Sequence, residues 1–429
     1  MDAPQHSPQS DDQPTRQAAE QAGQVTGQVT DQATEQAAGR SGEPPAGRRP
    51  PSRPPRVVVA PDSFKGSLSA VEVCAAVEEG VRRVHPGADV VRVPMADGGE
   101  GTLDCFLSAV GGQERVLTVA DPLGRPVRAR YALSGRGDAA VVELASASGL
   151  PLVADREPDA PRADTAGTGE LIADAVAQGA REILVCLGGS ATTDGGTGLL
   201  RALGFRFLDR DGRELPPGGG ALARLAAVDD RGVSPQVRAT RFRLACDVTN
   251  PLVGPRGAAA VFGPQKGATP EQVAELDAAL ARLADVLAEH TGVRVHDLPG
   301  AGAAGGACGG LVALLGGEPA RGAELVADTV GLPAALDGAD LVITGEGRVD
   351  GQSAGGKVAS AVASLARDRG VPAVALGGSV AGPLEDLHAL GLTAAFSIAD
   401  GPRTLDEMTG SADRLLADLA EQVVRLRLA

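Results

Sequence analysis

Tryptophan is absent from this chain of 429 residues, and seven phenylalanines with one tyrosine bring the aromatic content to only 2%. The cores must therefore be packed with alanine, valine and leucine, which allows helices to approach sheets closely. No apolar run comes near the roughly 18 residues that a membrane span requires, although apolar residues make up 43% of the chain. The composition predicts a globular protein and excludes a transmembrane one.

Cysteine is also scarce, and the spacing of the cysteines does not match that of a metal-binding site. The chain has five cysteines and no C-x-x-C pair. They are Cys74, Cys105, Cys186, Cys246 and Cys308. An odd and scattered set argues against a disulfide framework or a structural zinc site. The first residues, MDAPQHSPQSDDQP, are polar and acidic, unlike a secretory signal, so the sequence predicts a cytoplasmic protein with reduced thiols.

Positive charge is in deficit. The chain has 40 Lys and Arg against 55 Asp and Glu, a formal net charge of -15, and an isoelectric point near 4.9. A phosphate backbone would be repelled by the average surface, so we expect no nucleic acid partner. Small anions can bind only where positive charge is concentrated.

Lysine is the rarest of the charged side chains. Only Lys65, Lys266 and Lys357 are present, and each has a glycine neighbour. An ammonium is a compact point charge that a planar guanidinium does not replace, so the three lysines are candidates for binding anionic groups. The alternative is that they are leftover lysines in ordinary loops. The single asparagine, Asn250, is a further candidate, because a surface loop does not normally require the only asparagine in a protein.

The chain is too long for one hydrophobic core, since single cores stop growing at roughly 250 to 300 residues. Residues 1–55 are rich in Gln, Pro and Arg, which predicts a disordered tail and linker. From Val57 onward, short β-branched runs alternate with helical stretches rich in Ala, Leu and Val. This rhythm is typical of a parallel α/β fold.

Two segments, 115–135 and 204–217, break this rhythm and look like β-hairpins. Antiparallel strands in an otherwise parallel chain predict a second domain inserted in the middle. We therefore expect a Rossmann- or flavodoxin-like domain built from residues 56–112 and 293–429, and an inserted mixed α/β domain at 113–292.

Two loops rich in glycine and serine follow predicted strands and precede predicted helices. PDSFKGS, residues 61–67, combines Ser63, Lys65 and Ser67 with the free N–H groups of a helix start, capped by Ser69, and is a natural anion cradle. In LGGSATTDGGTG, residues 187–198, the glycines let the main chain approach a phosphate. Asp194 in this loop is either a catalytic carboxylate or a turn residue that caps the next helix.

Carboxylates lie in two further loops. MADGGEG, residues 95–101, places Asp97 and Glu100 close enough to share a magnesium ion, often through water, or to cap the next helix. The segment 245–268 brings Asp247 near Asn250 and Lys266 in sequence. Ligands of an open parallel sheet bind at the carboxyl ends of its strands, so these loops should gather on one rim.

Two familiar patterns carry less weight. GQSAGGK, residues 351–357, lacks the Ser or Thr that follows the lysine of a P-loop, and the run LVIT ends a dozen residues earlier. GAGAAG, residues 300–305, follows a poor strand and has no convincing ribose-binding acid about 20 residues further on. We expect a closely packed or flexible helix start there instead.

Isolated ammonium groups, anion loops and loop carboxylates are the components of magnesium-dependent phosphoryl transfer. The residues thus predict a kinase or a phosphate-binding enzyme. Two other classes stay open, namely a nicotinamide-dependent hydroxy-acid oxidoreductase that uses GAGAAG and a noncatalytic nucleotide sensor.

Eight motifs, in order, resemble the bacterial type I glycerate kinase family: APDSFKGSLSA, MADGGEGT, GTGELIADA, LGGSATTDGGTG, ACDVTNPLVGPRGA, VFGPQKGA, GAGAAGG and ITGEGRVDGQSAGGK. The resemblance runs from about Val57 to the C-terminus. It implies two α/β domains and the phosphorylation of (R)-glycerate by ATP with Mg²⁺, mostly to 2-phosphoglycerate. A kinase for another small hydroxy or sugar acid is the alternative, and a homo-oligomer is compatible with either.

Residue roles follow as expectations within these motifs. Asp194 is expected to be the general base, and Lys65 is the second expected catalytic residue. Substrate contacts are expected from Asp62, Ser63, Lys65 and Asn250. Nucleotide contacts are expected from Gly188, Gly189, Ser190, Lys266 and Lys357, with Glu346 and Asp350. Magnesium is expected at Asp97, Glu100 and Asp247.

Overall fold

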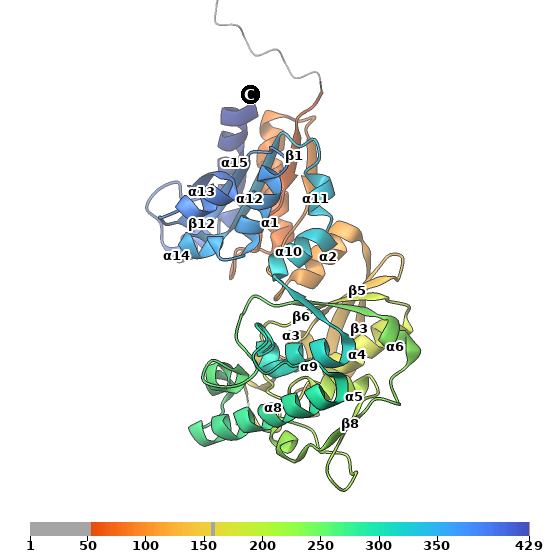
Figure 1. Ribbon diagram of the computed structural model, residues 1–429. Coiled ribbons are helices and arrows are strands. Elements are labelled where there is room, and N and C mark those ends of the chain that lie inside the picture. Colours follow the sequence, from red (N-terminus) through yellow and green to blue (C-terminus); the bar gives the residue numbers. More distant parts are fainter. Residues whose placement is uncertain (1–52, 156–158, 429) are drawn as a thin grey trace, which may run out of the picture. The chain divides into compact units, whose positions relative to one another are not determined.

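The computed structural model describes residues 53–155 and 159–428, in which strands and helices alternate (Figure 1). The described strands form a five-stranded sheet, a six-stranded sheet and a two-stranded ribbon. The prediction for residues 1–52 lies outside the described residues. The last three residues of the expected tail belong to the fold, because the Arg53 guanidinium donates to Asp340 at 3.0 Å and Asp89 N donates to Pro55 O at 2.9 Å.

The five-stranded sheet is entirely parallel, with the strand order β13-β12-β11-β1-β2. Its strands are β1 (Arg56–Val59), β2 (Asp89–Arg92), β11 (Leu341–Val349), β12 (Ala373–Val380) and β13 (Leu392–Ser397). β1 is central and fully buried at three successive valines, as expected for a strand covered on both faces. Val57 and Val59 lie in one core cluster and Val58 in another, because alternate side chains point to opposite faces.

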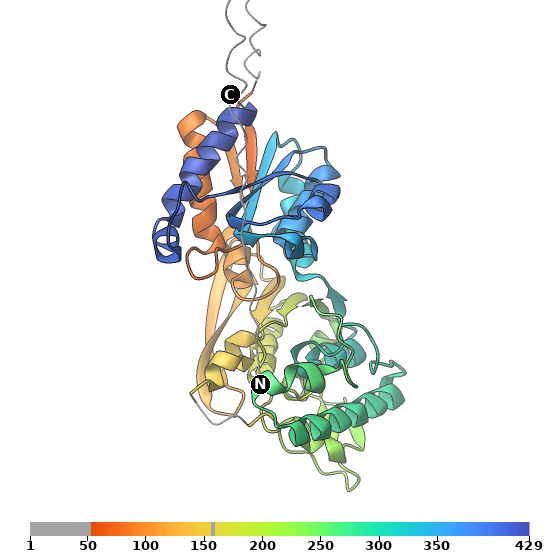
Figure 2. The ribbon, with the colours of Figure 1, turned by 90° about the vertical axis from the view of Figure 1, so that its left-hand side faces the viewer.

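Helices cover both faces of this sheet. They are α1 (Ala70–Val84), α2 (Thr102–Val110), α10 (Gly322–Thr329), α11 (Leu332–Ala335), α12 (Val358–Arg367), α13 (Glu385–Leu390), α14 (Leu405–Thr409) and α15 (Ala412–Leu428), with the 3₁₀ turn η5 (Gly351–Ala354). Figures 1 and 2 both show α15 beside α1. The predicted N-cap is confirmed, since Ser69 accepts from Glu72 N while the Glu72 carboxylate accepts from Ser69 N.

The six-stranded sheet is mixed, with the strand order β10-β9-β6-β5-β4-β3. Its strands are β3 (Gly112–Ala120), β4 (Pro126–Ser134), β5 (Ala139–Glu143), β6 (Glu182–Cys186), β9 (Arg241–Ala245) and β10 (Glu318–Ala320). β5, β6, β9 and β10 are parallel, whereas β3 and β4 form the predicted hairpin, in register from Gly112↔Ser134 to Ala120↔Pro126.

Helices of the same region pack around the mixed sheet. They are α3 (Ala145–Ser148), α4 (Ala166–Ala177), α5 (Thr197–Ala202), α6 (Pro235–Ala239), α7 (Ala258–Phe262), α8 (Pro270–Thr291) and α9 (Ala307–Leu315). The 3₁₀ turns are η1 (Leu150–Val153), η2 (Gly219–Arg224), η3 (Pro264–Lys266) and η4 (Ala303–Gly306). Three of the few aromatic residues are fully buried in this core, namely Tyr131, Phe207 and Phe242.

The second predicted hairpin, at 204–217, forms in part. Leu208 and Glu214 make an isolated antiparallel bridge, and Leu215 N donates to Phe207 O at 2.9 Å. The ladder of β7 (Arg206–Leu208), however, is formed with β8 (Ala227–Asp229). The Asp-Arg-Asp-Gly turn does form, since Gly212 N donates to Asp209 O. A turn fixes the reversal of the chain but does not choose the partner strand.

The predicted α/β class, with one parallel sheet and one mixed sheet, is confirmed. Strands of the mixed sheet come from residues 112 to 320 and strands of the parallel sheet from both flanking segments. The proposed domain boundaries at 112 and 292 stay a prediction. β10, which joins the mixed sheet, lies beyond residue 292. In the described part of the chain, every helix is too short or too polar to cross a membrane.

Candidate active site

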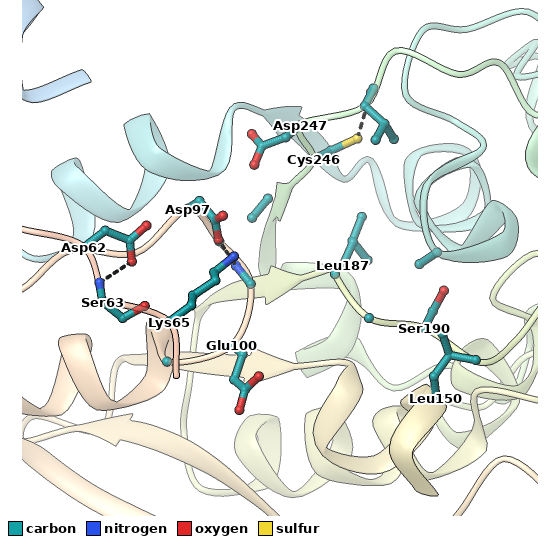
Figure 3. A pocket seen from close by; sticks show the side chains of 18 of the residues that line it. Asp62, Ser63, Lys65, Asp97, Glu100, Leu150, Leu187, Ser190, Cys246 and Asp247 are labelled. Carbon is teal, nitrogen blue, oxygen red and sulfur yellow. Dashed lines mark hydrogen bonds between the residues drawn. The ribbon is translucent and has the colours of Figure 1, made fainter. Parts of the chain in front are cut away.

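A cavity of about 850 Å³ is lined by loops that follow parallel strands of both sheets. Residues 62–69 follow β1 and residues 97–101 follow β2, while residues 187–190 follow β6 and residues 245–248 follow β9. The expected gathering of these loops at the carboxyl ends of strands is therefore observed, although the ends belong to two sheets instead of one. Figure 3 shows the cavity from close by.

The loop after β1 presents an uncommitted cation. The Phe64 side chain is 4% exposed, and Phe64 and Leu68 form a bridge that closes the loop. The Ser67 hydroxyl donates to Thr409 O at 2.9 Å. Lys65, between these anchors, is exposed and lines the cavity, and its ammonium has no hydrogen bond or ion pair with any described residue. In Figure 3 it extends from its loop toward the loop of Asp97 and Glu100.

Asp62 is the cavity carboxylate with the most perturbed protonation. Burial, together with the neighbouring charge of Asp97, raises the pKa of Asp62 to about 6, although the N–H of Ser63 opposes the shift. That N–H donates to one carboxylate oxygen at 2.6 Å. The other oxygen has no hydrogen bond with a described residue. Asp62 can therefore exchange a proton near neutral pH.

Asp97 and Asp247 lie on facing loops of the cavity. One oxygen of Asp97 accepts from Gly99 N at 3.1 Å, and one oxygen of Asp247 accepts from Gly322 N at 2.8 Å. Burial raises the pKa of Asp247, and the charge of Asp97 contributes to the shift. Each side chain keeps one oxygen without a partner among the described residues.

A metal site is not preformed by protein groups alone. Across residues 53–155 and 159–428, no three His, Cys, Asp or Glu side chains are grouped so that they could hold a metal ion. Asp97 and Asp247, each fixed through one oxygen and open at the other, nevertheless fit Mg²⁺, which usually binds one or two carboxylates beside water and phosphate oxygens. Glu100 lines the same cavity.

Lys266 is nearly buried, unlike Lys65. It is 6% exposed and lies in η3, where its ammonium donates to Ser190 Oγ at 2.9 Å and to Thr192 O. Burial lowers the pKa of Lys266 to about 8, against the opposing charge of Asp194. Lys266 therefore fixes the loop of Gly188, Gly189 and Ser190, all of which line the cavity.

The position of Asp194 argues against the role of general base. Asp194 is fully buried and does not line the cavity. One carboxylate oxygen accepts from Thr165 N, Thr165 Oγ1 and Gly198 N, and the other accepts from Gly196 N. These donors lie at the starts of α4 and α5, so Asp194 holds two helix starts together. This is the capping role that the sequence left open as the alternative.

Four other expected site residues lie outside the cavity lining. The Lys357 ammonium lies 3.8 Å from a Glu346 oxygen, and burial raises the pKa of Glu346. Asp350 caps η5 and pairs with Arg348, and the Asn250 amide donates to Arg256 O. β11 extends to Val349, so the GQSAGGK segment follows its strand directly and the expected gap is wrong.

Several residues that line the cavity were not predicted from the sequence. Arg130 and Asp104 line the cavity and pair through two hydrogen bonds of 2.9 Å, but neither lies in a motif. Leu150, Phe262 and Gln265 also line it. Phe262 and Gln265 belong to VFGPQKGA, in which the sequence predicts a role only for the lysine. Aromatic scarcity was the signal that could have identified Phe262.

The GAGAAG tract is packed against the glycine loop. A Cβ at Gly305 would lie 1.9 Å from Thr192 O, and Gly305 adopts φ +63°. Residues 303–306 are buried, and no strand precedes them within residues 294–299. The tract thus makes a close backbone contact, as expected, and does not form the strand, turn and helix of a dinucleotide site.

Comparison with known proteins decides the family. The model of the glycerate kinase family matches residues 57–428. The chain belongs to this family. Glycerate kinase of Halalkalibacterium halodurans is 44% identical, over 86% of this chain and 97% of that protein. Glycerate 2-kinase of Escherichia coli K12 is 45% identical, over 82% of this chain and 92% of that protein.

A solved structure supports the same assignment. A crystal structure assigned as glycerate kinase 2 of Salmonella typhimurium LT2 matches with a TM-score of 0.81 and 43% identity, over 87% of this chain and 98% of that one. The chain is therefore a glycerate kinase family enzyme, and ATP is the phosphate donor that a kinase of this kind implies. Neither the cavity nor the comparisons favour a nicotinamide-dependent oxidoreductase.

Proposed function

We propose that this enzyme transfers the γ-phosphoryl group of ATP to (R)-glycerate, with Mg²⁺, and that the product is 2-phosphoglycerate. The observation that carries the proposal is that the free ammonium of Lys65, the carboxylate of Asp62 and the glycine loop 188–190 line one cavity. The glycerate 2-kinase name of the Escherichia coli relative supports the 2-hydroxyl as the acceptor.

The charge of the cavity supports a requirement for a divalent cation. Its lining includes five carboxylates, Asp62, Asp97, Glu100, Asp104 and Asp247, against three basic groups, Lys65, Arg130 and Lys266. A triphosphate and a glycerate carboxylate would both be repelled by this excess. Mg²⁺ held by Asp97 and Asp247 would neutralise charge on the phosphates.

Asp62 is our candidate for the general base, in place of Asp194. An Asp62 oxygen accepts the proton of the glycerate hydroxyl, and that hydroxyl oxygen forms a bond to the γ-phosphorus. The bond between the γ-phosphorus and the bridging oxygen breaks, and ADP leaves with the electron pair. Lys65 and Ser63 hold the glycerate carboxylate or the transferred phosphoryl group, where a fixed cation stabilises charge in the transition state.

The loop of Gly188, Gly189 and Ser190 is proposed to hold the nucleotide phosphates. A Cβ at Gly188 would lie 3.5 Å from Cα of Gly99, so the glycine loop meets the loop of Asp97 and Glu100 at this point. Phosphates bound there would lie beside the proposed magnesium ligands. Lys266 holds this loop in place through its hydrogen bonds to Ser190 Oγ and Thr192 O.

Release of ADP tests the activity. The full-length enzyme should release ADP with ATP, Mg²⁺ and (R)-glycerate, and should do so far more slowly without glycerate or with glycolate or lactate in its place. Coupling the product directly to enolase, without a phosphoglycerate mutase, tests the position of phosphorylation because only 2-phosphoglycerate is its substrate. A product that requires the mutase would contradict the 2-hydroxyl, and ADP release independent of glycerate would contradict the activity.

A further inference from the structure

The cavity has two chemically different sides. Figure 3 shows Asp62, Asp97, Glu100 and Asp247 on one side and Leu150, Leu187 and Ser190 on the other. The lining residues drawn from segments 187–190, 262–266 and 303–304, together with Leu150, include no carboxylate. A neutral, flat and largely apolar group therefore fits the second side better than the first.

Phe262 gives this second side an aromatic surface. It ends α7, directly before the turn η3 that carries Lys266. Two phenylalanines line the cavity, but Phe64 is only 4% exposed, whereas Phe262 is half-buried. Lys266 of that turn donates to Ser190 of the glycine loop, which joins the segment of Phe262 to this loop. A partly exposed aromatic residue at such a cavity wall is the kind of surface on which a nucleobase stacks.

Gln265 adds hydrogen-bonding capacity beside that ring. It lies in η3, is exposed, lines the cavity, and its amide has no hydrogen bond with any described residue. A glutamine amide offers one donor and one acceptor side by side, which complements the amino group and ring nitrogen at the edge of adenine.

We propose that this side of the cavity binds the adenine base of ATP. Phe262 stacks on the purine, Leu150 and Leu187 complete the apolar wall, and Gln265 contacts the edge of the base. The inference rests on the proposed function. It orients the nucleotide from Phe262, along the glycine loop, toward Lys65, and it places the base away from Glu346 and Lys357, where the sequence had suggested nucleotide contacts.

The absence of tryptophan allows a direct test in the full-length enzyme. Phe262→Trp introduces a single tryptophan into a chain that has none. ATP or ADP with Mg²⁺ should quench its fluorescence saturably, and (R)-glycerate alone should not. The matched control is Phe396→Trp, at a phenylalanine that is 37% exposed and outside the cavity lining, and its fluorescence should not respond to nucleotide. An unchanged signal from Phe262→Trp at ATP concentrations that support turnover would overturn the proposal.

Steady-state kinetics provide a second readout if the tryptophan itself obstructs the site. Phe262→Ala should raise KM for ATP at least tenfold, roughly the loss of one stacking contact, with KM for glycerate and kcat within about twofold of wild type. Gln265→Ala should reduce the preference for ATP over GTP. An unchanged KM for ATP in Phe262→Ala would overturn the adenine site. The proposed glycerate reaction fails separately, through absence of glycerate-dependent ADP release while nucleotide still quenches Phe262→Trp.

Discussion

Lys65 and Lys266 line the same cavity in opposite electrostatic settings. Lys65 is exposed and uncommitted, so its charge is available to a ligand. Lys266 is buried, and its ammonium already donates to two groups of the glycine loop, so its first role is to hold that loop in place. Residue type alone suggested the same role for both, and only burial separates them. Lys357 differs from both, because it pairs with Glu346 and does not line the cavity.

Replacing Lys65 tests whether a compact ammonium is required. We expect Lys65→Arg to lower kcat/KM at least tenfold, because a charge-assisted contact is worth about 1.5–3 kcal/mol and a guanidinium cannot reproduce its geometry. Steady-state kinetics measure the effect. The matched exchange Arg210→Lys, at an exposed position outside the cavity lining, should leave kcat/KM unchanged. Wild-type kinetics for Lys65→Arg would refute its role.

Lys266 should leave a signature in the pH dependence of stability. Its pKa falls from 10.5 in the unfolded chain to about 8 in the folded one, so between these values the unfolded state binds one more proton. Stability should therefore rise with pH across this window. In Lys266→Met that contribution disappears. Denaturant unfolding of both proteins from pH about 8 to about 10.5 measures this contribution. Parallel plots of stability against pH for the two proteins would contradict the lowered pKa of Lys266.

Asp62 should set the acid limb of the rate profile. A base acts in its deprotonated form, so kcat/KM should fall as pH drops through about 6. A bound cation near Asp97 would move this limb lower, since it removes a repulsion that raises the pKa. Asp62→Asn should lose at least about a hundredfold in kcat. If Asp62→Asn keeps the wild-type kcat and the same fall of kcat/KM at acid pH, Asp62 is not the base.

At the scale of elements, Asp194 links the starts of α4 and α5. Asp194→Ala leaves several buried donors without an acceptor, so we expect a loss of about 2 kcal/mol or more in unfolding free energy. Asp62→Asn, in contrast, should change stability little while removing activity. Urea denaturation of both variants separates the two roles. A catalytically dead Asp194→Ala with wild-type stability would restore Asp194 as the base.

Local patterns predicted most of the elements. The alternation of β-branched runs with helical stretches predicted the parallel α/β class, and Ser69 marked the start of α1. The pairing of β7 with β8 was missed, because the turn after Leu208 gives no information about a strand about 20 residues away. The partners of Asp194 and Lys357 could not be predicted for the same reason, since burial and long-range contacts are not local properties.

For the whole molecule, the placement of loops at the carboxyl ends of parallel strands was the most useful rule. It predicted that the loops after β1, β2, β6 and β9 would meet, and they line one cavity. It did not predict that two sheets would supply them. Gly98 shows how closely they meet, because a Cβ there would lie 2.6 Å from Cβ of Ala245 and 2.8 Å from Cα of Gly322.

The central claim is that this one cavity binds both substrates. The most direct measurement is a crystal structure of the full-length enzyme with a nonhydrolysable ATP analogue, Mg²⁺ and (R)-glycerate. The account predicts the base against Phe262, the triphosphate along Gly188 to Ser190, and glycerate between Lys65 and Asp62. Nucleotide density elsewhere, for example in the smaller cavity lined by Arg321 and Ser360, with the cavity of Lys65 empty, would contradict it.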